Sequence, residues 1–420
     1  MDNSRKDYRP RIVDAELLAL LRGPGAVLIE GPRGCGKTET ARQAAASEVR
    51  LDTDQAAREL AELDPSLILE GPVPRLIDEW QTVPAIWNHV RRAVDDRRAP
   101  GQFILTGSSM PADDVTRHSG AGRFVRIRMR PMTLSESGHG TGSISLHGML
   151  DGIGPRSVDP GLTVPDLADR ICAGGWPGLV DLPIDSTLPA VRGYLAEIGR
   201  ADVGRVDATR RDPAGVQRLL RSLARNTATY ATNTTLAADS DPANPLDDET
   251  VRSYMGALER LMVVEDQPPW APGLRSRSRL RSRSKRHFVD PSLAAAALRL
   301  TPKRLLNDLR LMGFLFESLV IRDLRVYAQM ADATVLQYRD NTGLEVDAIV
   351  EMGDGRWAAF EVKLGPAQVD AAAVSLLRLA ERVDTDRIGK PTMLGVITGF
   401  GFGYMRPDGV AVIPIGALGP

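Results

Sequence analysis

Short apolar runs alternate with amphipathic stretches along the first third of the chain. Compact apolar runs predict buried strands, and apolar residues at three- and four-residue steps predict helices. These patterns predict helices at 11–22, before the second strand and at 84–94, and strands at 26–30, 49–52, 75–78, 102–106 and 124–129. A strand, a glycine-rich loop and a helix in this order open a parallel α/β unit. Residues 1–135 are therefore predicted to form a doubly wound α/β domain.

The pattern changes after residue 135. Residues 136–165 are rich in Gly, Ser and Pro and predict a linker, whereas residues 166–272 show helical periodicity. The last helix of that region runs into Met262-Val263-Val264, which suggests a winged-helix unit. Residues 273–287 form a basic, serine-rich loop. Residues 288–420 predict helices followed by a mixed sheet, so we expect a C-terminal α/β domain.

Composition narrows the class of protein only coarsely. The chain has 420 residues, 43% of them hydrophobic and 25% charged, as in a globular protein of roughly two to four domains. A formal net charge of −1 excludes a global attraction to nucleic acid or membranes. Two cysteines, five scattered histidines and no apolar run near about 18 residues argue against a disulfide framework, a Cys/His metal site and a membrane span. The N-terminus lacks the apolar core of a signal peptide, so we expect a cytoplasmic protein.

Lysine is scarce in this chain. Of 53 basic residues only six are lysine, and arginine supplies the rest. Lysine carries a compact charge on a flexible stem, whereas the arginine guanidinium is a rigid fork, so each lysine marks a position to inspect. The six are Lys6, Lys37, Lys285, Lys303, Lys363 and Lys390.

The segment from Gly31 to Thr38 fits the pattern G-x-x-x-x-G-K-[ST] of a phosphate-binding loop. Its glycines let backbone N–H groups face phosphates, and the following helix adds its N-terminal dipole. Lys37 is expected to reach the β- and γ-phosphates of ATP, and Thr38 to hold Mg²⁺. The alternative, a chance glycine-rich turn, is disfavoured by the strand before it and the helix after it. The predicted nucleotide-binding residues here are Gly31, Pro32, Arg33, Gly34, Cys35, Gly36, Lys37 and Thr38.

An acidic pair ends the predicted strand at 75–78. Asp78 is expected to bind Mg²⁺ through water, and Glu79 to orient and deprotonate the attacking water. An acidic helix cap is the alternative. Thr106, Ser108 and Ser109 end the next strand, where Ser108 is a candidate sensor of the γ-phosphate or part of a plain turn.

Two further residues of the first domain are candidates. Arg123 is a candidate for stabilising transition-state charge, in its own chain or in a neighbouring copy, and a surface arginine is the alternative. Cys35 lies within the loop, where its thiol is either a redox-sensitive group or a small filler residue.

The C-terminal region carries acidic residues on two neighbouring predicted strands. Asp347 lies on the first strand, and Glu361 and Lys363 share one face of the second because residues i and i+2 do. Such a set is able to bind a divalent metal and place an ammonium beside it, and Glu317 on the preceding helix completes the cluster. A solvated, salt-bridged edge is the alternative. The apolar flanks of both strands and the scarcity of lysine favour a buried site.

Together, these motifs resemble P-loop ATPases of the AAA+/STAND-like group that carry a DUF4143 C-terminal region. The segments that carry the resemblance are GPRGCGKT, LIDEWQTVP, ILTGSS, the GR at 122–123, RPMTLSE, GGWPG, FVDPSLAAAAL, FESLV, EVDAIVE and FEVKLG. The resemblance implies an ATPase core, a winged-helix middle and a PD-(D/E)XK nuclease-like domain. It places Lys37, Thr38, Asp78 and Glu79 in the ATPase motifs. It places Glu317, Asp347, Glu361 and Lys363 in a nuclease-like, Mg²⁺-binding pattern. Trp80 and the long basic loop depart from the family.

A nucleic-acid contact is the remaining expectation. The basic loop, with a winged helix beside it, is able to bind the phosphates of DNA or RNA, and a solvated loop is the alternative. A recognition helix is expected at 250–262, where Glu259 among the arginines argues against base reading. The basic residues of the loop are Arg275, Arg277, Arg279, Arg281, Arg283, Lys285 and Arg286.

These features predict an ATP-hydrolysing switch or motor whose C-terminal half engages nucleic acid. That half is either a Mg²⁺-dependent nuclease or an inactive, DNA- or protein-binding module of a regulatory ATPase. A nucleotide-dependent homo-oligomer is expected if Arg123 acts in trans, and no membrane partner is expected.

Overall fold

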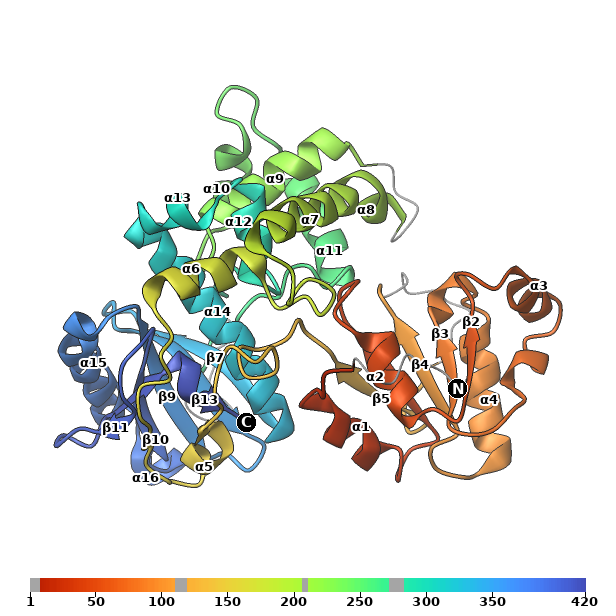
Figure 1. Ribbon diagram of the computed structural model, residues 1–420, viewed down its shortest axis with the longest axis horizontal. Coiled ribbons are helices and arrows are strands. Elements are labelled where there is room, and N and C mark those ends of the chain that lie inside the picture. The colour runs from red at the N-terminus through yellow and green to blue at the C-terminus, as the bar shows by residue number, and fades with distance from the viewer. Residues whose placement is uncertain (1–7, 110–118, 206–210, 272–282) are drawn as a thin grey trace. The chain divides into compact units, whose positions relative to one another are not determined.

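The computed structural model describes residues 8–109, 119–205, 211–271 and 283–420 (Figure 1). The chain forms two compact units. The first comprises Met1–Pro131, Ala201–Arg211 and Gly256–Val263, and the second comprises Met132–Arg200, Asp212–Met255 and Val264–Pro420. Each unit is described by itself.

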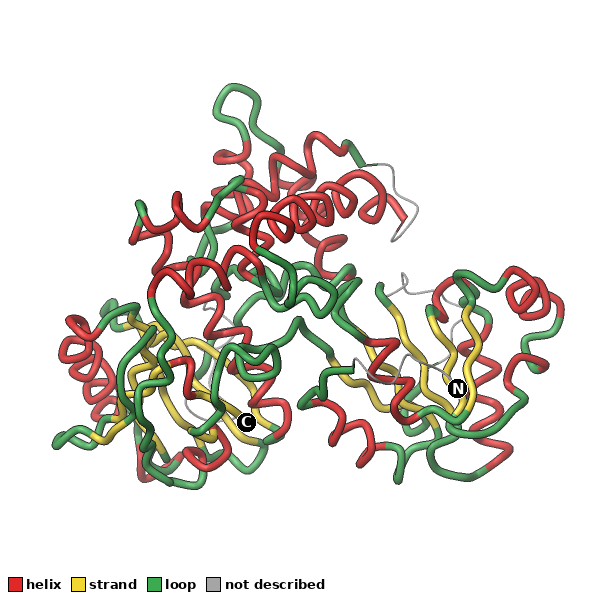
Figure 2. The backbone as a smooth tube through the Cα atoms, viewed as in Figure 1, coloured by secondary structure: helices red, strands yellow, loops and turns green. Residues whose placement is uncertain are grey.

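The first unit contains a five-stranded parallel sheet flanked by helices (Figure 2). The strand order is β2-β3-β4-β1-β5, and every pairing is parallel. The carboxyl ends of parallel strands meet at one edge, so the loops after β1, β3 and β4 converge there. The strands are β1 (Ala26–Glu30), β2 (Ser47–Arg50), β3 (Arg75–Asp78), β4 (Phe103–Gly107) and β5 (Phe124–Arg128). The helices are α1 (Val13–Leu20), α2 (Lys37–Ala44), α3 (Gln55–Leu63) and α4 (Ile86–Arg97), with short 3₁₀ turns at Leu67–Leu69 and Trp80–Thr82.

Strand β1 separates two apolar cores. Its Ala26 and Leu28 belong to one buried cluster, while Val27 and Ile29 belong to another. This division follows from the two-residue period of a strand, and burial on both faces explains why the segment is a continuous apolar run. The predicted doubly wound α/β fold is confirmed.

The middle of the chain is helical, as its periodicity predicted. Between α9 and α10, Thr229 forms an isolated backbone bridge with Arg286. After α11, Val264 pairs with Phe288 and Gln267 pairs with Lys285. This order of helices and paired segments is the one expected of a winged helix, whose assignment stays a prediction. The helices are α6 (Val164–Ala173), α7 (Ile184–Glu197), α8 (Val203–Arg205), α9 (Pro213–Arg225), α10 (Asn233–Ser240), α11 (Asp248–Arg260), α12 (Pro291–Ala297) and α13 (Pro302–Leu306), with a short π-helix at Ile198–Asp202.

The C-terminal region is a helix followed by a six-stranded mixed sheet, as the sequence predicted. The strand order is β11-β12-β10-β9-β8-β7, with β9, β10 and β12 parallel and the other pairings antiparallel. Helix α15 packs against the sheet through a shared apolar core, and α14 contacts β7, β8 and β9. The strands are β7 (Ala333–Arg339), β8 (Glu345–Met352), β9 (Trp357–Lys363), β10 (Met393–Thr398), β11 (Tyr404–Met405) and β12 (Ala411–Pro414). The helices are α14 (Leu309–Met330), α15 (Val369–Arg382) and α16 (Thr385–Ile388), with 3₁₀ turns at Pro366–Gln368 and Ile415–Ala417. No helix of the described residues is long and apolar enough to span a membrane.

Residues 136–165, which the composition predicted to be a linker, contain ordered structure. Strand β6 (Ile144–Ser145) pairs in parallel with β13 (Leu418–Gly419), and α5 (Leu146–Leu150) follows it directly. Leu146, Met149 and Leu150 are buried. The high content of Gly, Ser and Pro in this segment indicated a linker, so the short apolar helix was not predicted. The helix belongs to the same compact unit as the C-terminal sheet.

A buried arginine on α14 joins distant segments of the second unit. Arg322 donates to Asp290 at 2.8 Å and pairs with Asp323 at 2.7 Å. Asp290 also accepts a hydrogen bond from the Gly175 backbone at 3.0 Å, and Asp323 accepts one from the Leu134 backbone at 3.0 Å. Burial raises the pKa of Asp323 to about 6, although Arg322 opposes this shift. One guanidinium thereby fixes segments that lie far apart in sequence.

We expect Arg322→Ala to lower the free energy of unfolding of the second unit by about 3–5 kcal/mol, because two carboxylates lose their buried counter-ion. Urea denaturation followed by circular dichroism measures this change. Arg252→Ala is the matched control. Arg252 is exposed and pairs with Asp248 on the surface of α11, so its loss is expected to stay below about 0.5 kcal/mol. A loss for Arg322→Ala no larger than the control's contradicts the prediction.

Candidate functional site

The predicted phosphate-binding loop joins β1 to α2 at the carboxyl edge of the parallel sheet. Gly34 and Gly36 have φ angles of 78° and 102°, which only glycine adopts without strain. A Cβ on Gly31 would lie 2.4 Å from the carbonyl oxygen of Met129. These three glycines are therefore required by the path of the backbone, which exposes its N–H groups at the start of α2.

The ammonium of Lys37 lies inside this loop. Its Nζ donates hydrogen bonds to the carbonyl oxygens of Gly31 and Pro32, each at 3.0 Å. The lysine is buried although it begins a helix whose next residues are polar. The ammonium is therefore held inside the loop by two neutral acceptors, and its contact with phosphates stays a prediction.

Three side chains meet at the end of β3. Thr38 donates a hydrogen bond to Asp78 at 2.8 Å, and Thr106 donates to the same carboxylate oxygen. Burial raises the pKa of Asp78, while the two hydroxyl hydrogen bonds lower it. A hydroxyl and a carboxylate beside a phosphate-binding loop are the ligands that Mg²⁺ takes in P-loop enzymes, directly and through water. The donor set therefore fits the metal.

Glu79 follows Asp78 in a left-handed conformation with φ of 52°. Its carboxylate accepts hydrogen bonds from the Ser108 hydroxyl at 2.8 Å and from the Gln81 amide. Its backbone N–H donates to Thr106 at 3.3 Å. The structure thus brings Glu79, Asp78, Thr38 and Ser108 together, whereas Gln81 was not anticipated from the sequence. Trp80, which departs from the family pattern, is buried in the core beside Trp87.

Arg11 anchors the loop, and no sequence motif pointed to it. Its guanidinium donates to the carbonyl oxygens of Cys35 and Arg130, both at 2.8 Å. Cys35 is fully buried, so its side chain serves packing, which supports the filler interpretation over a redox-sensitive thiol. Arg33 in the same loop has an exposed side chain.

Arg123 lies at the other edge of the sheet. Phe124, the first residue of β5, pairs with Ala26, the first residue of β1, whereas the loop follows Glu30 at the far end of β1. Five residues of strand separate the two positions by roughly 15 Å. Arg123 pairs with Asp95 on α4 at 2.9 Å. It therefore does not join Lys37 and Asp78, and a role for Arg123 within its own chain does not fit this placement.

A second cluster lies between α14 and the C-terminal sheet. The ammonium of Lys285 donates hydrogen bonds to Glu317 at 2.7 Å and to Asp347 at 3.0 Å. Lys285 is only 3% exposed. The sequence placed this lysine in the basic loop among the candidate phosphate contacts, whereas its side chain is buried among carboxylates. Arg286 is also half-buried and bonds Asp266 and Asn233, while residues 275–281 lie outside the described residues.

Lys363 completes the cluster from β9. It donates to Glu361 at 2.6 Å and to Asp347 at 3.2 Å, so the predicted shared face of Glu361 and Lys363 is confirmed. Asp347 also accepts a hydrogen bond from the Val362 backbone at 3.0 Å. Burial and the charge of Asp347 raise the pKa of Glu361 to about 8, and the same two causes raise the pKa of Glu317 to about 7. The two ammonium groups and the backbone hydrogen bond from Val362 instead lower the pKa of Asp347. Near pH 7 the cluster thus contains two ammonium groups, an ionised Asp347, and two carboxyl groups, Glu317 and Glu361, that retain part of their protons.

The predicted metal-binding carboxylates Glu317, Asp347 and Glu361 are brought together, but they are paired with ammonium groups, and metal binding there stays a prediction. Within the described ranges, no group of three or more His, Cys, Asp or Glu side chains is placed to hold a metal ion. The ammonium of Lys285 lies between the carboxylates of Glu317 and Asp347.

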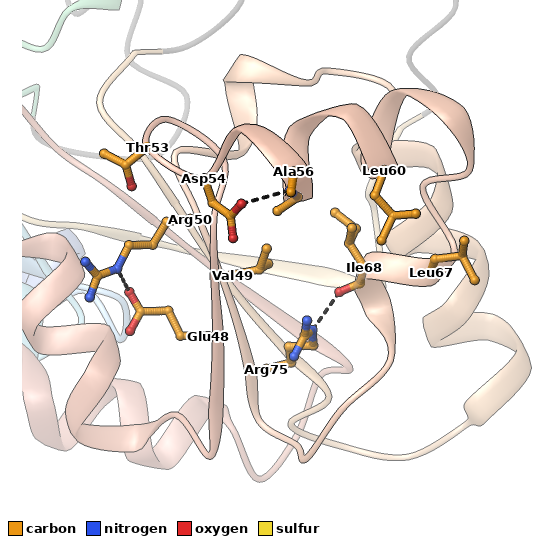
Figure 3. A pocket seen from close by; sticks show the side chains of 11 residues that line it. Glu48, Val49, Arg50, Thr53, Asp54, Ala56, Leu60, Leu67, Ile68 and Arg75 are labelled. Atoms are coloured by element: carbon orange, nitrogen blue, oxygen red, sulfur yellow. Dashed lines mark hydrogen bonds and ion pairs between the residues drawn. The ribbon is translucent and has the colours of Figure 1, made fainter. Parts of the chain in front are cut away.

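One cavity lies at the C-terminal cluster, and another lies elsewhere in the first unit. The first, of about 510 Å³, is lined by Tyr230, Lys285, Arg310 and Lys363 among others. The other, of about 600 Å³, lies beside β2 and α3. Figure 3 shows its charged side at Glu48 and Arg50 and its apolar residues at Leu60, Leu67 and Ile68. None of the predicted nucleotide-binding residues lines this second cavity.

Family comparisons agree with the motifs. Residues 24–138 match a family described as an AAA domain, and residues 312–418 match DUF4143, a domain of unknown function. Residues 164–304 match another domain of unknown function, DUF8612. The chain therefore carries a P-loop AAA domain in its N-terminal part and a DUF4143 domain in its C-terminal part.

Individual relatives add little about activity. Two uncharacterized proteins, from Mycobacterium bovis and Mycobacterium tuberculosis, are each 26% identical over 352 residues, covering 82% of this chain and 71% of the relative. A DNA polymerase III gamma subunit-related protein from Thermotoga maritima aligns over 60% of this chain and 100% of its own, with 11% identity and a TM-score of 0.23. The structure of Drosophila ORC bound to DNA aligns over 69% and 85%, with 13% identity and a TM-score of 0.18. At these TM-scores neither structure supports a functional argument.

We expect Glu361→Gln to reduce the dependence of stability on pH. Between the ordinary glutamate pKa of 4.5 and a folded-state pKa of about 8, the folded protein retains a proton that the unfolded chain releases. Stability therefore falls as pH rises through this window, by at most about 1.4 kcal/mol per pH unit for this group. The glutamine removes that contribution and leaves the one from Glu317. Urea midpoints across the window measure this contribution. Glu345→Gln, at a half-buried glutamate that pairs with Arg339, is the control. Equal slopes for wild type and Glu361→Gln contradict the prediction.

Proposed function

We propose that the protein is an ATP-hydrolysing switch or motor driven by its AAA domain. The observation that supports this most is the meeting of Lys37, Thr38 and Asp78 at one edge of the parallel sheet, with Thr38 hydrogen-bonded to Asp78 at 2.8 Å. ATP and Mg²⁺ are the proposed ligands. The loop N–H groups and Lys37 would bind the phosphates, and Thr38 and Asp78 would hold the metal, which neutralises phosphate charge when bound.

Glu79 is the proposed general base. In the described conformation Ser108 and Gln81 hold its carboxylate beside Asp78. A carboxylate in that place is able to orient an attacking water and accept its proton, and Ser108 is placed to respond when a phosphate approaches. Hydrolysis would then change the hydrogen bonds of the loop after β4, which is how nucleotide state reaches the rest of the domain.

The role of the C-terminal half is the less defined part of the proposal. The order of α9, Thr229, α10, α11 and the paired segments supports a winged helix, which would engage DNA or RNA. Burial of Lys285 and the internal pairing of Arg286 remove two cations from the proposed phosphate contact. This observation favours the alternative, a regulatory ATPase whose nuclease-like domain is a binding module.

We expect Lys37→Ala and Glu79→Gln to separate binding from turnover. Loss of the loop ammonium removes phosphate affinity, so Lys37→Ala is expected to lose both binding of a fluorescent ATP analogue and ATPase activity. Glu79→Gln keeps the shape of the site and is expected to bind the analogue while kcat falls about 10²–10⁴-fold. Lys303→Ala, at an exposed lysine on α13, is the control. Undiminished ATP hydrolysis by Lys37→Ala would falsify the proposal.

We expect Arg123 to act on the nucleotide of a neighbouring copy, because its place at the amino edge of the sheet keeps it from its own. Arg123→Ala is then expected to lower kcat about 10³-fold or more. A mixture of Arg123→Ala and Glu79→Gln proteins should regain activity, since each supplies the group that the other lacks. Arg92→Ala is the control, because Arg92 is an exposed arginine on α4 that pairs with Asp96. An inactive mixture, with turnover per molecule that does not change with protein concentration, contradicts a role in trans.

A further inference from the structure

The carboxylate cluster of Glu317, Asp347 and Glu361 already contains a buried cation, the ammonium of Lys285. The Nζ of Lys285 lies 2.7 Å from an oxygen of Glu317 and 3.0 Å from an oxygen of Asp347. A second ammonium, from Lys363, bonds the other oxygen of Asp347 at 3.2 Å. Both oxygens of Asp347 are therefore engaged by ammonium groups, and one of them also accepts the backbone N–H of Val362. A divalent ion would need these same oxygens at about 2.0–2.6 Å.

The backbone around Lys285 holds its side chain in this place. Lys285 exchanges two backbone hydrogen bonds with Gln267, at 3.0 and 2.9 Å. The Gln267 side chain is itself fixed, because its amide donates to the carbonyl oxygens of Leu336 and Asp347, each at 2.9 Å. Through Gln267, the backbone of Lys285 is therefore linked to β7 and β8. The ring of Tyr230 covers the ammonium at 5.7 Å.

We propose that Lys285 is the resident cation of this cluster, in the place where a nuclease of the PD-(D/E)XK kind would hold Mg²⁺, so that the C-terminal domain neither binds a divalent metal there nor cleaves nucleic acid through one. A dication added beside a buried ammonium would meet repulsion in a region of low dielectric. Moving Lys285 aside would instead leave both Glu317 and the Lys285 ammonium buried without their partner, which costs free energy. All the residues involved lie in the second unit, so the inference stands or falls independently of ATP hydrolysis.

The test asks whether removing the ammonium creates a metal site. Nucleotide-free wild type, Lys285→Ala and Lys363→Ala proteins are compared with and without Mn²⁺, by thermal melting and by electron paramagnetic resonance of the bound ion. Lys285→Ala is expected to gain one Mn²⁺ and to melt roughly 5 °C or more higher when the ion is about a hundredfold above its dissociation constant. Lys363→Ala is the matched control, because Lys285 still lies between Glu317 and Asp347; it is expected to gain neither. Methylammonium should also stabilise Lys285→Ala and not the wild type.

Three outcomes overturn the proposal. The first is a Mn²⁺ ion on the wild type that Glu317→Gln removes, and this measurement stands even if Lys285→Ala fails to fold. The second is a folded Lys285→Ala protein that binds no Mn²⁺, because the lysine would then not be what excludes the metal. Cleavage of DNA or RNA by the wild type that depends on Mn²⁺ and is lost in Glu317→Gln overturns it as well.

Discussion

The second unit depends on one buried guanidinium. Arg322 is enclosed between Asp290 and Asp323, which are themselves fully buried. Such a group costs a large desolvation energy, which only complete pairing offsets. The pairing is complete because the two carboxylates also accept backbone N–H groups from Gly175 and Leu134. Three segments remote in sequence are thereby tied to α14, the same helix that carries Glu317 into the carboxylate cluster.

This constraint also gives a physical reason for several motifs. Gly174 has a φ of 77°, and a Cβ on Gly175 would lie 2.0 Å from the carbonyl oxygen of Met132, so the pair of glycines in GGWPG lets the backbone reach Asp290. Asp290 begins α12 as its N-cap, with Ser292 N–H at 2.9 Å. The neighbouring Trp176 donates to the Ser292 hydroxyl at 3.0 Å. The motifs are thus parts of one buried polar network.

Features that depend on local sequence patterns were predicted correctly from the sequence. The strands at 26–30 and 75–78 were placed at their observed bounds, because a continuous apolar run between turn residues has few other structures. The loop that surrounds Lys37 was predicted from a sequence motif of fixed spacing. Lys285 could not be predicted, because its basic, serine-rich neighbours indicate a solvated loop, while its burial depends on a backbone pairing with Gln267. Arg11 was missed for the same reason: its two acceptors lie 24 and 119 residues away.

Lys37 and Lys285 are both buried, and they differ in the groups that accept their hydrogen bonds. The acceptors of Lys37 are two neutral carbonyl oxygens, so an arriving phosphate offers the ammonium a charged partner and gains by replacing them. The acceptors of Lys285 are two carboxylates, and any ligand that displaces the lysine must neutralise both in a buried place. The same side chain is therefore held by neutral carbonyl oxygens in the AAA domain and by carboxylates in the second unit.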